Sequence, residues 1–377
     1  MTSTRVKRTG RSVFRRVGAV VLSASLLFLA LPERASAEPY LAVQKGLHCS
    51  ACHSHTAGGG RRIVYGNVFA QNEMPAETVG GGEQGIWTGQ VMKFLAVGGN
   101  FRSRYESIDI PGNEELSEFD VTRGTVYLEA TLIPNRLSVY VDQQLAPNGS
   151  LNREAYAKVR DRSGKWHLAG GQFYLPYGLR LQDDSAFIRR TTGINFETPD
   201  RGLQLGYENG SWSTIVSATN GSGGGAEIDD GKQFSAVTTW VRPGWRVGAS
   251  FNDNNADAGD RQMFNVFAGL RTGPVAWLAE VDRIRDALDA GVTRDAIAGL
   301  VEGNWLIRKG HNLKIGYEYF DPDDDLDEDH QVRWSAIWEY TPIQFLQGRV
   351  GVRLYDGVPE NDFDNRDEYF LELHGFF

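Results

Sequence analysis

From residue 86 to the C-terminus, apolar and polar residues alternate along the chain with a period of two. Segments 126–132 (VYLEATL), 313–319 (LKIGYEY) and 349–354 (RVGVRL) show this pattern clearly. Successive side chains of a β-strand point to opposite faces, so the alternation predicts strands with one apolar and one polar face. No window in this region shows sustained helical periodicity, and we therefore expect an all-β fold.

The alternating segments number about sixteen, and the connections between them are alternately short and long. The segments start near residues 92, 119, 137, 151, 166, 202, 211, 233, 244, 261, 274, 295, 311, 330, 345 and 367. Tight connections lie at 133–136, 162–165, 208–211, 242–245, 271–274 and 308–311, and longer polar ones at 109–118, 146–152, 175–201, 220–232, 252–260, 283–294, 321–329 and 356–366. An even strand number with short turns at one end is typical of a transmembrane antiparallel β-barrel of the bacterial outer membrane. The alternative is a soluble all-β protein, which has no reason to keep its long loops at one end.

The last strand of this pattern ends on the C-terminal residue, Phe377. Its apolar positions alternate with Glu372 and His374, which we expect to point into the barrel. A final strand that closes on a terminal phenylalanine resembles the recognition signature of bacterial outer-membrane proteins. Aromatic residues near the strand ends would form the interfacial girdles: Trp166, Tyr174, Trp240, Trp277, Trp305 and Tyr340.

The long connection 175–201 differs from the other loops because it mixes apolar residues with both signs of charge. It follows the fifth predicted strand and carries Arg180, Asp183, Asp184, Arg189 and Arg190. Porins have a similar loop that folds inward and narrows the pore, where charged side chains set ion selectivity. We expect the same inward fold here, and the alternative is a plain surface loop.

The first 37 residues have the features of a secretory signal peptide. A basic head is followed by an apolar run from Val17 to Leu31 and by the small-residue sequence Ala35-Ser36-Ala37. The alternative is a transmembrane anchor, but this run is shorter than the roughly 20 residues that span a bilayer. Without residues 1–37 the chain has 32 basic and 47 acidic residues, a formal net charge of −15. This balance disfavours nucleic acid as a partner, because phosphate contacts need clustered lysine and arginine.

The chain has only two cysteines, and both lie in the sequence Cys49-Ser50-Ala51-Cys52-His53. This spacing is the one that attaches a c-type haem, in which each thiol adds to one vinyl group and the histidine binds the iron. We therefore predict one covalent haem c on Cys49 and Cys52, with His53 as the proximal ligand. A thioredoxin-like redox pair is disfavoured because no βαβ pattern surrounds it. A zinc site would need further ligands, which His48 and His55 could supply.

The sixth iron ligand has several candidates. Met74 lies far enough along the same short segment and has suitable chemistry, although its alternative role is that of a packing methionine. The alternation predicts that His374 and His167 point into the barrel, near the end that carries the tight connections. The ligand could also come from elsewhere or be absent, and we rank Met74 first because a local ligand needs no long-range closure.

The chain divides into residues 1–37 as signal peptide, 38–82 as haem c-binding segment and 83–377 as outer-membrane barrel. A segment of forty-odd residues seldom builds a core that covers a porphyrin. We expect it to form a plug inside or against the barrel, where lumen side chains complete the haem pocket.

The outer loops are rich in carboxylates. Asp323, Asp324, Asp325 and Asp327 fall in the run 321–329. Such groups bind or concentrate divalent cations, although acidic loops are more commonly solvated surface.

A haem-attachment segment followed by a barrel resembles the fused monohaem cytochrome–porins of the outer membrane, whose best-known members oxidise ferrous iron outside the cell. The stretch 39–46 (PYLAVQKG) leading into the haem motif carries the sequence similarity, and the architecture is matched over the remaining chain. The resemblance implies haem attachment at Cys49 and Cys52 and ligation by His53. It also implies electron transfer between an extracellular donor, with ferrous iron as candidate, and a periplasmic carrier such as a soluble cytochrome. Outer-membrane lipid would surround the barrel. The alternatives are a passive diffusion porin with a non-conducting haem peptide and a barrel partner of separate cytochromes.

Overall fold

The computed structural model describes residues 38–80, 85–194, 198–257, 259–288 and 291–377, and its dominant feature is one large antiparallel sheet. The signal peptide predicted for residues 1–37 and the predicted boundary at residue 82 lie outside these ranges. The sixteen long strands among the described residues are β2 (Leu95–Asp109), β3 (Leu116–Ile133), β4 (Leu137–Ala146), β5 (Leu151–Arg160), β6 (Trp166–Phe173), β7 (Asp200–Asn209), β8 (Trp212–Thr219), β9 (Gln233–Arg242), β10 (Trp245–Asn254), β11 (Gly259–Thr272), β12 (Val275–Leu288), β13 (Val292–Arg308), β14 (His311–Asp321), β15 (Gln331–Ile343), β16 (Leu346–Asp356) and β17 (Asp367–Phe376).

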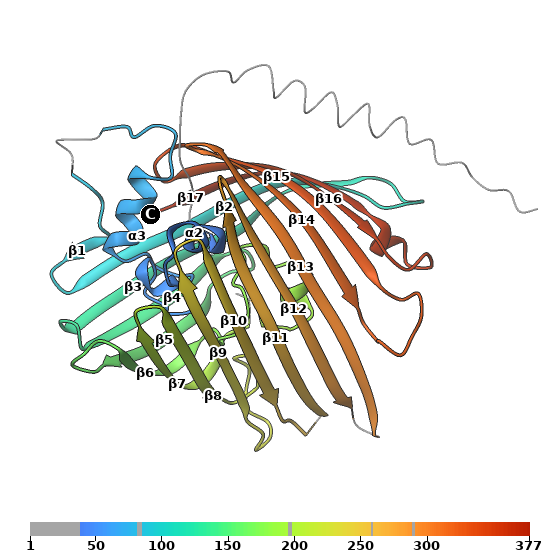
Figure 1. The fold of residues 1–377 in the computed structure, drawn as a ribbon, viewed down its shortest axis with the longest axis horizontal. Coiled ribbons are helices and arrows are strands. Elements are labelled where there is room, and N and C mark those ends of the chain that lie inside the picture. The colour runs from blue at the N-terminus through green and yellow to red at the C-terminus, as the bar shows by residue number, and fades with distance from the viewer. Residues whose placement is uncertain (1–37, 81–84, 195–197, 258, 289–290) are drawn as a thin grey trace, which may run out of the picture.

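Each long strand pairs with its neighbours in sequence, and the ring closes where β17 pairs with β2. At this closure Leu371 lies opposite Tyr105. A short strand, β1 (Gln90–Met92), pairs with β2. Figure 1 shows the strands wrapping around a common lumen. The predicted transmembrane antiparallel β-barrel of about sixteen strands is confirmed.

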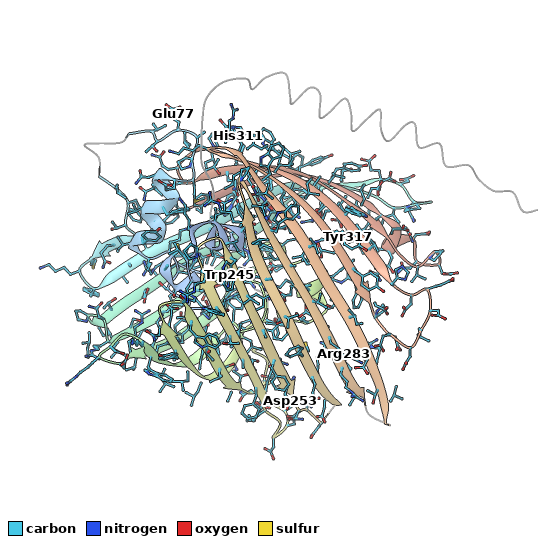
Figure 2. All side chains as sticks on the ribbon, viewed as in Figure 1. Glu77, Trp245, Asp253, Arg283, His311 and Tyr317 are labelled. Atoms are coloured by element: carbon cyan, nitrogen blue, oxygen red, sulfur yellow. The ribbon has the colours of Figure 1, made fainter. Side chains whose placement is uncertain are left out.

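The two faces of the barrel differ in polarity as the alternation predicted. On β17, Leu371 is 56% exposed on the outer face, whereas Glu372 is 1% exposed and points into the lumen. The outer face carries many exposed valine, leucine and aromatic side chains, which suit a lipid environment. Figure 2 shows side chains projecting from both faces along the whole barrel.

The N-terminal segment, residues 38–80, lies against the barrel end that carries the tight turns, which we call the short-turn end (Figure 1). It contains α2 (Pro39–Lys45), the single turn η1 (Cys49–Ala51) and α3 (Val64–Asn72). Helix α2 begins with a proline at its first position and ends at Gly46, whose φ of 65° is accessible to glycine. A Cβ at Gly46 would lie 2.8 Å from the Cα of Pro243, so only glycine lets α2 approach this turn.

Further contacts hold the N-terminal segment at this end. Ala76 donates a backbone hydrogen bond to Thr341, and His48 Nε2 lies 3.0 Å from the carbonyl oxygen of Gly210. Figure 2 shows Glu77, which follows Ala76, near His311 at the same rim. None of the helices among the described residues combines the length and the apolar character of a membrane span.

The connection between β6 and β7 enters the lumen, as predicted from its mixed composition. We call its described residues, 174–194 and 198–199, the inward loop. The first three residues of its short helix α4 (Phe187–Arg190) are buried, and the helix packs near β12, β13 and β14 on the other side of the lumen. The backbone N–H of Phe187 donates to Glu318, and Arg333 pairs with Asp183 at 2.9 Å. Although burial opposes ionisation, Arg353 and Arg333 hold the pKa of the Asp183 carboxyl well below its usual range.

An ion pair also connects the N-terminal segment to the barrel wall at β14. Lys314 on β14 pairs with Glu38 and lies 3.7 Å from Glu339 and 3.9 Å from Glu302. These side chains are nearly inaccessible to solvent, so each charge depends on its neighbours for compensation.

The bilayer itself supplies a test of the barrel's outer face. Leu371→Lys should reduce the free energy of unfolding by about 2 to 4 kcal/mol, because it puts a charge into the lipid-facing belt. Leu326, which is 59% exposed in the loop before β15, is a matched control, since Leu326→Lys leaves the charge in water. The measurement is urea unfolding of protein inserted in lipid vesicles, and equal losses for both variants would contradict this orientation of β17.

Candidate functional site

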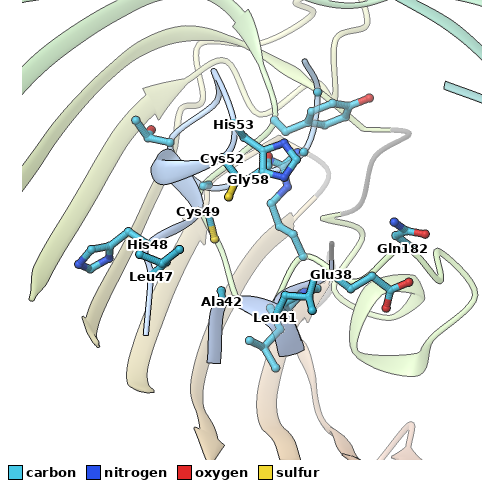
Figure 3. A pocket seen from close by; sticks show the side chains of 18 of the residues that line it. Glu38, Leu41, Ala42, Leu47, His48, Cys49, Cys52, His53, Gly58 and Gln182 are labelled. Carbon is cyan, nitrogen blue, oxygen red and sulfur yellow. The ribbon is translucent and has the colours of Figure 1, made fainter. Parts of the chain in front are cut away.

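The cysteine motif forms a compact turn that directs three side chains into one cavity. The N–H groups of Cys52 and His53 both donate to the carbonyl oxygen of Cys49, at 3.1 and 3.0 Å. Cys49, Cys52 and His53 all line this cavity. Figure 3 shows the two thiols side by side with the His53 ring close to them.

The cavity lies between the N-terminal segment, the inward loop and two walls of the barrel. Its lining includes residues 178–180 of the inward loop, Tyr127 on β3 and Phe267 on β11. The empty space around these residues is about 1600 Å³, a value that includes open solvent at the mouth of the cavity. Its lining combines apolar side chains such as Leu41 and Phe69 with a small number of charged ones, as is typical of cofactor sites.

The His53 imidazole has the properties of a metal ligand. Burial, together with the charge of Arg62, lowers its pKa to about 3, so the ring is neutral at physiological pH. Its Nδ1 atom is buried and makes no hydrogen bond to any of the described residues. A neutral imidazole with an unpaired nitrogen is the form that binds iron or another metal.

The two cysteines are free thiols, and each is partly buried. Burial, with the neighbouring Cys49, raises the pKa of the Cys52 thiol to about 11. Gly58 leaves room beside Cys49, since a Cβ there would lie 3.4 Å from the Cys49 sulfur. Gly66 lets α3 touch the backbone of Cys52, because a Cβ would lie 2.3 Å from its carbonyl oxygen. The thiols therefore face a cavity whose walls are shaped by close backbone contacts.

The structure does not bring together the four ligands of a zinc site. His48 turns toward Gly210, and His55 lies 3.4 Å from Glu154 and 3.0 Å from Arg180. Within the described ranges, the one cluster of three or more metal-binding side chains is Asp323–Asp325 in the outer acidic loop. The histidines beside the cysteine motif thus contact the barrel instead of completing a metal centre.

The predicted distal ligands lie away from the cavity lining. Met74 is 2% exposed in the core formed with Phe69 and Tyr40. His374 is buried beside Gln347, at 3.3 Å, and His167 lies 3.4 Å from Thr56. The structure therefore brings Cys49, Cys52 and His53 together but not the three candidates for the sixth position.

The partners that hold the motif come from the barrel wall. Ser54 donates to Glu129 at 2.5 Å, and Arg61 pairs with the same carboxylate. The N–H of Arg61 donates to the Tyr140 hydroxyl at 3.0 Å. The alternation indicated that Glu129 points inward, but no sequence signal linked it to a segment about seventy residues earlier.

Comparisons with known proteins identify the fold. No family model and no curated protein matches the chain. Among solved structures, OmpT of Vibrio cholerae in its loop L8 deletion form is similar with a TM-score of 0.58 and 14% identity, covering 76% of this chain and 100% of that one. An anion-selective porin from Comamonas acidovorans gives a TM-score of 0.61 at 8% identity, covering 75% and 99%. OprB of Pseudomonas putida gives 0.60 at 10% identity, covering 76% and 94%.

These structures define the class of this protein: a porin-like, closed β-barrel. Its apolar outer face and this fold locate it in the outer membrane of a Gram-negative bacterium, as predicted. Identities this low establish the fold alone, so the chemistry of the cavity has to be argued from its own residues.

Docking of the motif depends on Gly60, which has a φ of 64°. A Cβ there would lie 2.3 Å from the Tyr140 hydroxyl, so Gly60→Ala should weaken docking of the N-terminal segment. Gly164 is the matched control, because its φ of 73° is similar and nothing lies within 4 Å of its added Cβ. We expect Gly60→Ala to cost about 1 to 3 kcal/mol more than Gly164→Ala. Protease cleavage of residues 38–80 is the measurement, and equal protection in both variants would contradict the contact.

Proposed function

We propose that this protein is an outer-membrane c-type cytochrome with one haem bound covalently in the lumen of its porin-like barrel. The observation that supports it is the convergence of Cys49, Cys52 and His53 on one large cavity, in the order and spacing of haem attachment. Lumen side chains complete the pocket that the short N-terminal segment cannot build alone.

Each residue of the motif has a defined part in this proposal. Cys49 and Cys52 would hold the haem through thioether bonds, and His53 would bind the iron through its neutral ring. Bound haem would supply one-electron redox chemistry, which the side chains of a barrel lack. The turn η1 presents both thiols to the cavity, and residues 178–180 of the inward loop line the same cavity.

The position of the cavity suits the transfer of electrons between an extracellular donor and a periplasmic carrier. The N-terminal segment contacts the tight turns around Gly210 and Pro243, and short turns face the periplasm in outer-membrane barrels. A soluble cytochrome could thus approach the motif from the periplasm. Ferrous iron is the candidate donor, on the resemblance to the fused cytochrome–porins, and its oxidation is the candidate activity.

A second candidate function is passive diffusion, and the fold favours it. The structural relatives are porins, one of which is described as anion-selective. In this reading the N-terminal segment would be a non-conducting peptide in a diffusion pore. A barrel partner for separate cytochromes is a further alternative with the same fold.

Covalent attachment is the first test. The protein from a host that attaches haem should have a mass one haem above that of its polypeptide, and Cys49→Ala with Cys52→Ala should lose this increment and the haem stain. Ser50→Ala is a control, because Ser50 lies in the same turn as the cysteines and donates to Glu208 on β7 but takes no part in attachment. Wild-type protein that stays free of haem in such a host would refute the proposal.

Diffusion is tested separately by swelling of liposomes in sugars of increasing size. We expect slow swelling, because the N-terminal segment and the inward loop both occupy the lumen and pair with its walls. Swelling as fast as that of an open porin, together with haem that a periplasmic cytochrome cannot oxidise, would favour the diffusion function.

A spectroscopic prediction concerns the sixth ligand of the haem iron. Met74→Leu keeps the volume of a buried apolar side chain, so it should cost less than about 1.5 kcal/mol of stability. Because Met74 packs outside the cavity lining, the far-red absorption of oxidised protein should stay unchanged. Loss of a methionine-to-iron charge-transfer band in this variant would establish Met74 as the ligand.

A further inference from the structure

The described residues that line the cavity carry an excess of positive charge. Its cationic side chains are those of Lys45, Arg62, Arg102, Arg123, Arg180 and Arg246, and its carboxylates are those of Glu38 and Asp142. A cavity enclosed by protein and poor in water is a costly location for charge without compensation. Each of these cations therefore needs an ion pair or hydrogen bonds for compensation.

Neither carboxylate forms an ion pair with Arg102 or Arg246 among the described residues. Glu38 pairs with Lys314 and lies 3.9 Å from Arg349. The cations that act on Asp142 are Arg123, Arg153 and Arg180, and Glu154 acts on it as a second carboxylate.

Three of the cations also have partners. These contacts are Lys45 with Glu73 at 3.2 Å, Arg123 with Asp184 at 2.8 Å, and Arg180 with the carbonyl oxygen of Gly58 at 2.8 Å. Arg62 lies over the Phe376 ring, with 4.6 Å between the guanidinium carbon and the ring centroid, and its Nε has no hydrogen-bond partner among the described residues. Arg62 is only half-buried, however, so water can reach part of its side chain. Arg102 and Arg246 remain, and both are buried.

Arg102 and Arg246 are buried and have no ion pair with any residue in the described part of the chain. Arg246 is 7% exposed, its guanidinium carbon lies 5.8 Å from the centroid of the Phe267 ring, and its Nε and Nη1 atoms have no hydrogen-bond partner among the described residues. Arg102 is 8% exposed, its Nε is likewise unpartnered within these ranges, and its Nη1 makes one long bond of 3.4 Å to the carbonyl oxygen of Gln182. Two carboxylates act on Arg102 from a distance, and both are bound by other arginines: Glu372 by Arg104 and Arg349, and Asp184 by Arg123.

The two arginines reach the cavity from facing walls. Arg102 is on β2 and Arg246 is on β10, and these strands are eight positions apart in the ring of sixteen. Both side chains line the space that also receives Cys49 and His53. A ligand in this cavity that carries two carboxylates would meet an unpaired guanidinium on each side.

We propose that Arg102 and Arg246 bind the two propionate carboxylates of the haem, an inference that rests on the haem attachment proposed above. The propionates of a haem lie on the ring edge away from the vinyl groups that the cysteines hold. Each guanidinium presents a planar pair of N–H donors that matches a carboxylate, and such charge-assisted hydrogen bonds are stronger than neutral ones. The ligand thereby supplies the compensation that the protein lacks.

The test is the midpoint potential of the haem in purified protein, measured by spectroscopic titration at pH 7. A nearby positive charge favours the reduced haem, because reduction adds an electron. Arg102→Gln and Arg246→Gln should therefore each lower the potential, whereas Arg102→Lys and Arg246→Lys should restore most of it. Arg162→Gln is the control, because Arg162 is exposed in the tight turn after β5 and should leave the potential unchanged.

A second measurement uses the wild-type protein alone and does not depend on the folding of any variant. With haem labelled with ¹³C in its propionates, infrared spectra should show both groups as ionised carboxylates in strong hydrogen bonds at pH 7. Propionate bands typical of solvent-exposed groups would overturn the proposal.

The outcomes separate this inference from the proposed function. Wild-type protein without attached haem would refute the function itself. Attached haem with equal potentials in the wild type and both glutamine variants would refute only the arginine assignment. A change of ion selectivity in planar bilayers, with unchanged haem potential, would instead assign the two arginines to anion passage.

Discussion

Closure of the sheet between β17 and β2 is the constraint on which the rest of this structure depends. In a bilayer, backbone N–H and C=O groups find no water, so an edge strand would leave a row of unpaired groups. The pairing of Leu371 with Tyr105 removes that edge. Closure with sixteen strands also fixes a lumen wide enough to admit folded chain. The N-terminal segment and the inward loop both fold in this space.

The lumen replaces the hydrophobic core that a small domain would need. Residues 38–80 contain two short helices and a single turn, too little to enclose a large cofactor. The barrel wall supplies the missing partners: Glu129 holds Ser54 and Arg61, and Tyr140 accepts from the Arg61 backbone. These groups are polar because lumen-facing positions of such barrels are polar. The motif is thus held by ion pairs and hydrogen bonds, and apolar packing is concentrated around α2 and Met74.

Charge in the lumen links the fold to the proposed chemistry. Lys314, Arg333 and Arg349 sit in networks in which carboxylates compensate each guanidinium or ammonium group. Arg102 and Arg246 stand apart from these networks and line the cavity of the cysteine motif. The same barrel therefore combines charges paired in networks at the N-terminal segment and the inward loop with two buried cations, Arg102 and Arg246, for which we propose a ligand in the cavity.

The sequence by itself determined the strands, their inward and outward faces, the tight turns and the cysteine motif, because each depends on a local pattern of period two or on spacing within five residues. It also indicated that the loop after β6 enters the lumen, since its mixture of apolar and charged residues is unusual for a solvated loop. It could not determine which side chains share the cavity. Arg102 and Arg246 are separated by more than 140 positions, and only ring closure brings β2 and β10 to face each other. Likewise, Met74 appeared suitable as a ligand by its distance along the chain, but in the structure it follows the end of α3 and packs in the apolar core with Tyr40 and Phe69, where burial of a thioether among aromatic side chains is favourable.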